Sequence, residues 1–336
     1  MKLLLSTSNI MGGSSIVRRG AGSKSNTELV SSLRANFADH TDAPQIDGNG
    51  NGTGNGTGNG RTTVNVAKPS YKSWTKKTGD ALEIPALDFQ HSALQEEREN
   101  YDITAKLFFL PGGSKETREA QTKEAIDLVK KELHVDSIDL LIVSFPGIYF
   151  DEEEDCPDKI STRGPVEAEP EPLEGQIEAW KTLESLKEQG VVARLGVAEF
   201  GKERLETFLE KVKTKPDVDQ INLRDCCSVP KDLMALAKSK SVELLVHNDC
   251  SNILPRGTTR ELLGSGPTGA GVLAQPSKAG DKRKSLHGEE STNCTTPDIL
   301  VGDVQPQWVI KYTAVVRNRG VVENKGYFAV AELSQE

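Results

Sequence analysis

Two stretches of the sequence place chemically versatile side chains within or directly after an apolar run. Lys106 interrupts the run YDITAKLFF, residues 101–109, and the triplet His247-Asn248-Asp249 follows the next-to-last apolar run. A lysine inside an apolar segment needs a negatively charged partner, because an unpaired charge is costly to bury. The triplet lacks the further His or Cys that a metal site requires. Local hydrogen bonds that fix a loop are therefore favoured for it, and a contact with a partner protein is the alternative.

Cys226 and Cys227 follow another apolar run and could form a redox or intersubunit thiol site. Adjacent cysteines rarely reach the geometry of a disulfide with each other. Small, apolar-like residues at a strand end are the simpler interpretation. The chain has 5 cysteines and no CxxC pair, which argues against a disulfide framework or a zinc site. A reducing, cytoplasmic setting is expected.

Composition excludes two classes of partner. The formal net charge is −9, whereas nucleic acids and anionic membranes attract a basic surface. No apolar run approaches the length of a membrane span. The acidic stretch Asp151–Asp155, with further carboxylates up to Glu174, could dock a basic partner, although such a stretch is more often a solvated insert.

The elements that must position these residues follow from hydrophobic periodicity. Residues 189–249 contain three apolar runs separated by two amphipathic stretches, which predicts a βαβαβ unit. Parallel strands need such crossover helices, so the unit suggests a doubly wound sheet or a (β/α)₈ barrel. The predicted strands cover residues 2–5, 101–109, 137–145, 191–197, 218–223, 242–246 and 321–330, and the predicted helices cover residues 25–37, 114–133, 173–189, 202–212, 231–240 and 305–319.

The remaining segments are interpreted from their composition. Residues 96–100 are predicted to end a helix, and residues 68–88 carry no clear pattern. Flexible inserts are expected at about 40–66, 151–172 and 256–300, because these stretches are rich in Gly, Asn, Ser, Pro or like charges. We expect residues 1–336 to form a single domain with these inserts.

Several motifs resemble known families. The sequence GVVARLGVAEFGKERLETFLE resembles the fifth strand and helix of the aldo-keto reductases. The stretches INLRDCC-x-x-P, LLVHND and RNRGVVENKGY resemble the regulatory subunits of glutamate–cysteine ligase, which keep an aldo-keto reductase-like barrel. The resemblance implies an α/β fold, a (β/α)₈ TIM-type barrel that lacks the final helix.

The resemblance also places the reductase residues on this chain. Aldo-keto reductases use Asp, Tyr, Lys and His at the carboxyl ends of the strands, where the Tyr donates a proton and NADPH donates a hydride. Lys106 matches the Lys, but Ser144 stands where the family has His, and a hydroxyl cannot replace imidazole near neutral pH. Tyr71 and Asp88 precede Lys106 without the family's spacing. Catalysis is therefore expected to be lost, with Lys106 and Ser144 as relic positions.

The positions that bind the cofactor in the resembled family are likewise only partly kept. Ala198 and Glu199 replace the Ser-Asn pair that holds the nicotinamide amide, whereas Gln220 matches the family's Gln. His247 stands near the position of the stacking aromatic, and the late phosphate-binding motif is reduced to Lys325 and a glycine. A phosphate site without its Arg is weak. We expect no bound cofactor and no metal.

The expectation for function follows from the resemblance. It implies a non-catalytic regulatory subunit in glutathione biosynthesis that forms a heterodimer with the catalytic subunit of glutamate–cysteine ligase. It would raise the affinity for glutamate and relax feedback inhibition by glutathione. The alternative is an NADPH-dependent aldo-keto reductase that acts on a small carbonyl substrate. A barrel that serves only as a scaffold for another complex is a third interpretation.

Overall fold

The structure is a computed structural model that describes residues 1–12, 25–41, 69–150, 168–223, 228–266, 268–274 and 299–334. The strands are β1 (Lys2–Ser6), β2 (Lys76–Thr78), β3 (Ala81–Ile84), β4 (Tyr101–Phe109), β5 (Ile138–Ser144), β6 (Val192–Ala198), β7 (Val218–Ile221), β8 (Glu243–Val246), β9 (Asp303–Val316) and β10 (Val321–Ser334). The helices are α1 (Ser25–Thr41), α2 (Arg118–Leu133), α3 (Leu173–Glu188), α4 (Lys202–Lys211), α5 (Lys231–Lys240) and α6 (Arg256–Leu263). Short 3₁₀ turns lie at Tyr71–Ser73 and Arg98–Asn100.

The middle of the chain forms the predicted alternation of strands and helices. Strands β4 to β8 are parallel neighbours in one sheet, and α2 to α5 are the crossovers between them. Buried side chains dominate β5 and β6, as expected for strands that are covered on both faces. The α/β class is confirmed.

The C-terminal hairpin differs from the sequence-based prediction. Residues 305–319 were predicted as a helix, but residues 305–316 belong to β9, which pairs antiparallel with β10 and with β4, and residues 317–319 lie in the turn that follows. Successive residues of β9 are buried on opposite faces of the sheet, Val309 in one core cluster and Ile310 in the other. Gly320, with φ +62°, sits in the tight connection to β10. Pairing with two neighbouring strands thus outweighs a helix-like spacing of apolar residues.

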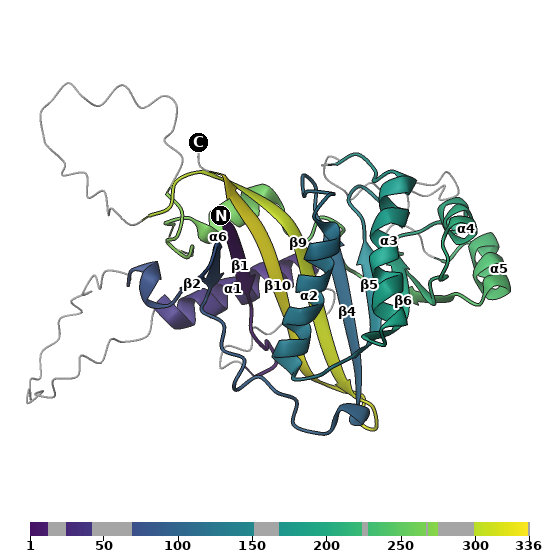
Figure 1. Ribbon diagram of the computed structural model, residues 1–336, viewed down its shortest axis with the longest axis horizontal. Coiled ribbons are helices and arrows are strands. Elements are labelled where there is room, and N and C mark those ends of the chain that lie inside the picture. The colour runs from purple at the N-terminus through teal and green to yellow at the C-terminus, as the bar shows by residue number, and fades with distance from the viewer. Residues whose placement is uncertain are drawn as a thin grey trace, which may run out of the picture.

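The sheet has two ends. Its strand order is β2-β3-β1-β10-β9-β4-β5-β6-β7-β8, and the β9–β10 hairpin lies between β1 and β4 (Figure 1). Among the described residues no hydrogen-bonded pairing joins β2 to β8, so the sheet lacks the closure that a complete barrel would have. β2 and β8 are therefore edge strands.

Helices pack on both faces of the sheet. Figure 1 shows α2 and α3 in front of the sheet, with α1 behind β1 and β10. The larger core cluster lies under α2 to α5, and a second cluster lies under α1 and α6. The neighbouring residues Tyr327 and Phe328 of β10 belong to different clusters, so the hairpin forms part of both cores.

The structure differs from the expectation in one of the inserts and at the helix end expected near residue 100. The insert expected at 256–300 begins with α6 instead of flexible chain, because Thr259, Leu262 and Leu263 are buried on one helix face. Residues 96–100 were predicted to end a helix, but Arg98–Asn100 form a short 3₁₀ turn directly before β4. Residues 42–66 and 151–167 of the other two inserts lie outside the described residues. No helix in the described part of the chain is long and apolar enough to cross a membrane.

A buried carboxyl between α2 and β9 should make stability depend on pH. Glu132 accepts a hydrogen bond from the Tyr312 hydroxyl at 3.2 Å. Burial raises the pKa of Glu132 from 4.5 to about 7, against the opposing hydrogen bonds from Tyr312 and Ser92. The stabilising contribution of the protonated form is complete below pH 4.5 and is lost as the pH rises to about 7. The loss is on the order of 3 kcal/mol by the usual conversion.

The variant Glu132→Gln tests this dependence. It should flatten the stability profile between about pH 4.5 and 7 and be more stable than wild type at about pH 8. Urea unfolding followed by circular dichroism at several pH values measures both quantities. An unchanged pH profile in the variant would show that Glu132 is ionised at no cost in the folded state.

Candidate functional site

Lys106 is buried in the centre of the sheet. It lies on β4 opposite Lys311 of β9 and beside Ile142 of β5. Its side chain is 5% exposed, and its Nζ donates to Asp249 Oδ2 at 3.0 Å and to Gln220 Oε1 at 2.7 Å. The Nζ also lies 3.4 Å from His247 Nδ1. The lysine of the apolar run therefore has the carboxylate partner that its burial requires.

Asp249 is the shared counter-ion of two lysines. Its second carboxylate oxygen accepts a hydrogen bond from Lys311 Nζ at 2.9 Å, and its backbone carbonyl accepts one from Asn222 Nδ2 at 3.1 Å. Burial alone would raise the pKa of Asp249, but the charges of Lys106 and Lys311 hold that pKa well below its usual range. The carboxyl is thus ionised and shared between two ammonium groups.

His247 links this ion cluster to Glu199. The Asp249 backbone N–H donates to His247 Nδ1 at 2.9 Å, so in the neutral ring the proton is assigned to Nε2. That nitrogen lies 2.6 Å from Glu199 Oε1, although the two atoms are too poorly aligned for a regular hydrogen bond. Glu199 Oε2 accepts from the Phe150 backbone N–H at 3.0 Å. Glu199 has φ +67°, a left-handed conformation that turns its carboxylate back into the site.

We call these six residues, Lys106, Glu199, Gln220, His247, Asp249 and Lys311, the Lys106 cluster. The cluster holds two lysines and two carboxylates, so its formal charge is balanced when His247 is neutral. Burial lowers the pKa of Lys106, while the charges of Asp249 and Glu199 act in the opposite direction. Among the described residues no tyrosine hydroxyl hydrogen bonds to Lys106 Nζ, so these contacts hold no counterpart of the tyrosine that donates the proton in the resembled reductases.

Other residues named from the sequence lie apart from the cluster contacts. Ser144 is buried at the end of β5, where it pairs with Phe108. Tyr71 belongs to the core cluster under α1, and Asp88 is exposed and hydrogen bonded to the Gln90 backbone N–H. Cys226 and Cys227 lie outside the described residues, so their predicted roles stay predictions.

Lys325 has a structural contact. Its Nζ lies 2.7 Å from Glu28 of α1, which ties β10 to that helix. A Cβ at Gly326 would come within 2.6 Å of the Ser8 carbonyl oxygen, so this glycine allows β10 and the β1 end to approach. These contacts give Lys325-Gly326 a role in packing.

Sequence reasoning missed one residue of the Lys106 cluster and one buried carboxylate elsewhere in the protein. Lys311 was hidden in the segment predicted as a helix, so its contact with Asp249 was not foreseen. Glu171 was grouped with a solvated acidic stretch, but it is 5% exposed and accepts from Arg118 Nη2 at 2.8 Å. An isolated Lys in the apolar run QWVIKYTAVV is the signal that could have identified Lys311, by the same argument that applied to Lys106.

The residues present do not fit a nicotinamide group. At the position where the resembled family holds the carboxamide, Glu199 places a buried carboxylate whose oxygens face His247 and the Phe150 N–H. His247, at the position near the stacking aromatic, is itself held between Asp249 and Glu199. A carboxylate at this position would repel the carbonyl oxygen of a carboxamide, and an ionised carboxylate cannot donate the hydrogen bond that this oxygen needs.

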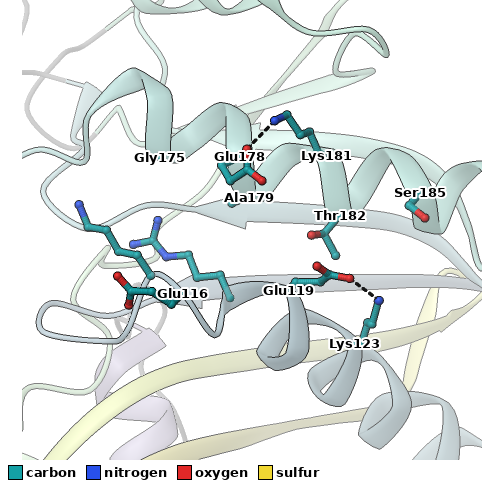
Figure 2. Close-up of a pocket in the computed structure, with 11 residues that line it drawn as sticks. Glu116, Glu119, Lys123, Gly175, Glu178, Ala179, Lys181, Thr182 and Ser185 are labelled. Carbon is teal, nitrogen blue, oxygen red and sulfur yellow. Dashed lines mark hydrogen bonds and ion pairs between the residues drawn. The ribbon is translucent and has the colours of Figure 1, made fainter.

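A separate cleft of about 430 Å³ lies between α2 and α3. Figure 2 shows Glu119 paired with Lys123 along α2, and Glu178 paired with Lys181 along α3. These ion pairs are exposed and stay within one helix each, so they contribute little to stability. None of the lining residues belongs to the Lys106 cluster.

Comparisons with known proteins place the chain in a family context. The model of the Aldo/keto reductase family matches residues 73–250. The "Glutamate--cysteine ligase regulatory subunit" of Homo sapiens is 27% identical over 253 residues, which cover 75% of this chain and 74% of that protein. The "Putative glutamate--cysteine ligase regulatory subunit" of Schizosaccharomyces pombe is 26% identical over 266 residues, covering 75% and 82%.

Similar solved structures are aldo-keto reductases. One is the aldose reductase from Giardia lamblia, 22% identical, with a TM-score of 0.31. The match covers 42% of this chain and 43% of that chain, less than half of either. The two relatives named above, both called regulatory subunits, each match about three quarters of this chain.

Proposed function

The chain belongs to the aldo/keto reductase family, and from this premise we propose that it is a non-catalytic regulatory subunit of glutamate–cysteine ligase. It would bind the catalytic subunit as a heterodimer in the cytoplasm, raise the affinity for glutamate and relax feedback inhibition by glutathione. Residues 1–336 would act as one domain in this complex. The names of the relatives from mammals and yeast support the partner.

One observation carries the non-catalytic part of the proposal. The Nζ of Lys106 forms an ion pair with Asp249, and the other carboxylate oxygen of Asp249 forms an ion pair with Lys311 of β9. A lysine that adjusts the acidity of a catalytic tyrosine must lie beside that tyrosine, whereas this one is held in a closed and charge-balanced cluster. The former reductase centre would therefore serve to stabilise the sheet.

Regulation would then act through association. The catalytic subunit must have at least two states, and this chain must bind the more active state more tightly. A bound glutamate and this chain would each strengthen the binding of the other, since coupling between two binding sites is reciprocal.

An NADPH-dependent reductase is the second candidate. Lys106 and Gln220 match the reductase positions, and their contact at 2.7 Å keeps them together. The carboxylate of Glu199 opposes this candidate, because it removes the amide partner of the nicotinamide. We therefore expect NADPH affinity to be weak or absent, and fluorescence quenching by NADPH at micromolar concentrations would contradict that expectation.

The main proposal is tested by γ-glutamylcysteine synthesis. The catalytic subunit is assayed with and without this chain while glutamate and glutathione are varied, and the mixture is analysed by gel filtration. We expect co-elution, a lower KM for glutamate and weaker inhibition by glutathione. Separate elution and unchanged kinetics would contradict the proposal, and NADPH oxidation with carbonyl substrates would then test the reductase candidate.

A further inference from the structure

The β8 edge of the sheet carries backbone groups that point away from the protein's own strands. The Glu243 N–H donates to the Asp217 carbonyl at 2.9 Å, and the His247 N–H donates to the Ile221 carbonyl at 3.0 Å. Backbone groups of alternate residues in a strand face opposite sides. The N–H groups of Leu244 and Val246 therefore face the open edge, since β8 ends the strand order. An open edge is a template for a further strand.

The two edges of the sheet are protected differently. β2, at the other end, is only three residues long and exposes Lys76 and Lys77, one on each face of the sheet. Charged side chains and short length are the usual means of blocking an edge. β8 has the sequence ELLV, and its Val246 is 60% exposed. β8 is also short, but Glu243 is its only charged residue, so the rest of this edge is apolar, whereas the β2 edge carries two lysines.

The helix beside β8 adds a basic and partly apolar face. Met234 of α5 is 45% exposed; Lys231 and Lys238 are exposed on the same helix face, and Lys240 is exposed at the end of the helix. Within the described ranges these three lysines make no ion pair, whereas Asp232 lies 3.8 Å from Lys202. The chain as a whole carries a net charge of −9, so this local excess of positive charge runs against the average. The exposed face of α5 therefore suits an acidic partner that also presents an apolar side chain.

Resting on the function proposed above, we propose that the β8 edge and the exposed face of α5 form the docking surface for the catalytic subunit of glutamate–cysteine ligase. The occupant is an extended, acidic segment of that subunit, which adds to the sheet as a strand beside β8. Its backbone hydrogen bonds to Leu244 and Val246, its carboxylates face the lysines of α5, and an apolar side chain covers Met234. Figure 1 places α5 at one extremity of the molecule, where a partner can approach.

Two variants of the full-length chain test this surface in binding to the catalytic subunit. Val246→Pro removes an edge-facing N–H and leaves the bonds between β7 and β8 in place, and we expect the Kd to rise about ten-fold or more. The double variant Lys231→Glu/Lys238→Glu should raise the Kd about ten-fold at low salt and less at about 0.5 M salt, because screening weakens charge attraction. Circular dichroism verifies that each variant is folded.

The matched control is Lys76→Glu/Lys77→Glu, which makes the same charge change at the β2 edge and should leave the Kd unchanged. If wild type binds and both test variants bind equally well, the docking surface is wrong while the regulatory function stands. If wild type itself does not bind the catalytic subunit, the proposed function is contradicted, and the docking surface with it. If Val246→Pro alters only the self-association of this chain, measured by sedimentation, the occupant is a second copy and the proposal is overturned.

Discussion

Replacing Asp249 with alanine is expected to lower the free energy of unfolding by about 3–5 kcal/mol. The carboxylate is the shared counter-ion of Lys106 and Lys311, at 3.0 and 2.9 Å. The side chains of Lys106 and Asp249 are only 5% and 7% exposed. Without the carboxylate, Lys106 would keep a buried charge with only neutral contacts to Gln220 and His247, and removing one partner of a buried pair is strongly destabilising. Urea unfolding at pH 7 measures the loss.

A second substitution and a control separate charge from packing. Lys106→Met in the Asp249→Ala background should recover part of the lost stability, because it removes the unpaired buried charge. Asp88→Ala changes a carboxylate that is 61% exposed and should leave the urea midpoint nearly unchanged. A wild-type midpoint for Asp249→Ala would contradict the geometry of the Lys106 cluster.

Glu171→Ala is expected to have an effect of similar size, about 3–5 kcal/mol, at an independent site. The carboxylate accepts from Arg118 Nη2 at 2.8 Å and lies 3.1 Å from Lys115 Nζ, and its backbone carbonyl accepts from Gln176 at 2.7 Å. Burial would raise the pKa of Glu171, but the bonds to Arg118 and Lys115 lower it overall. The guanidinium of Arg118 packs over the Phe109 ring at 4.8 Å, so it would stay buried without its anion.

The neighbouring Glu174 supplies the control for this variant. It lies in the first turn of α3 and is exposed, so Glu174→Ala should change stability by no more than about 0.5 kcal/mol. Glu171→Ala combined with Arg118→Met should be more stable than Glu171→Ala alone. Equal effects of Glu171→Ala and Glu174→Ala would mean that the acidic stretch is solvated throughout, as its composition had suggested.

Local hydrophobic periodicity was sufficient to predict the parallel half of the sheet. The runs at 191–197 and 242–246 and the helix at 202–212 were recovered almost residue for residue as β6, β8 and α4. These elements are short and close in sequence, so their pattern contains the information that fixes them. The opposite case is β9, whose apolar spacing also fits a helix. Its identity depends on pairing with β4 and β10, and β4 lies about two hundred residues away in the chain.

The Lys106 cluster was predictable only in part. A lysine in an apolar run implies a carboxylate, and the triplet at 247–249 was singled out because it directly follows an apolar run. The second lysine, Lys311, enters from β9 and required the topology to be known. The burial of Glu171 could not be read from its acidic surroundings, because its partner Arg118 lies on α2, more than fifty residues earlier in the chain.

The central claim is that this chain regulates another enzyme and that the Lys106 cluster is structural. It is tested most directly by the glutamate KM of the catalytic subunit in complex with wild type or with Lys106→Met/Asp249→Asn, a variant that keeps the charge balanced. We predict that both lower the KM to the same extent, within about two-fold, provided that the variant is folded and in excess over its Kd. A folded and bound variant that fails to lower the KM would show that the cluster acts in function, and a wild-type chain that leaves the KM unchanged would contradict the regulatory role itself.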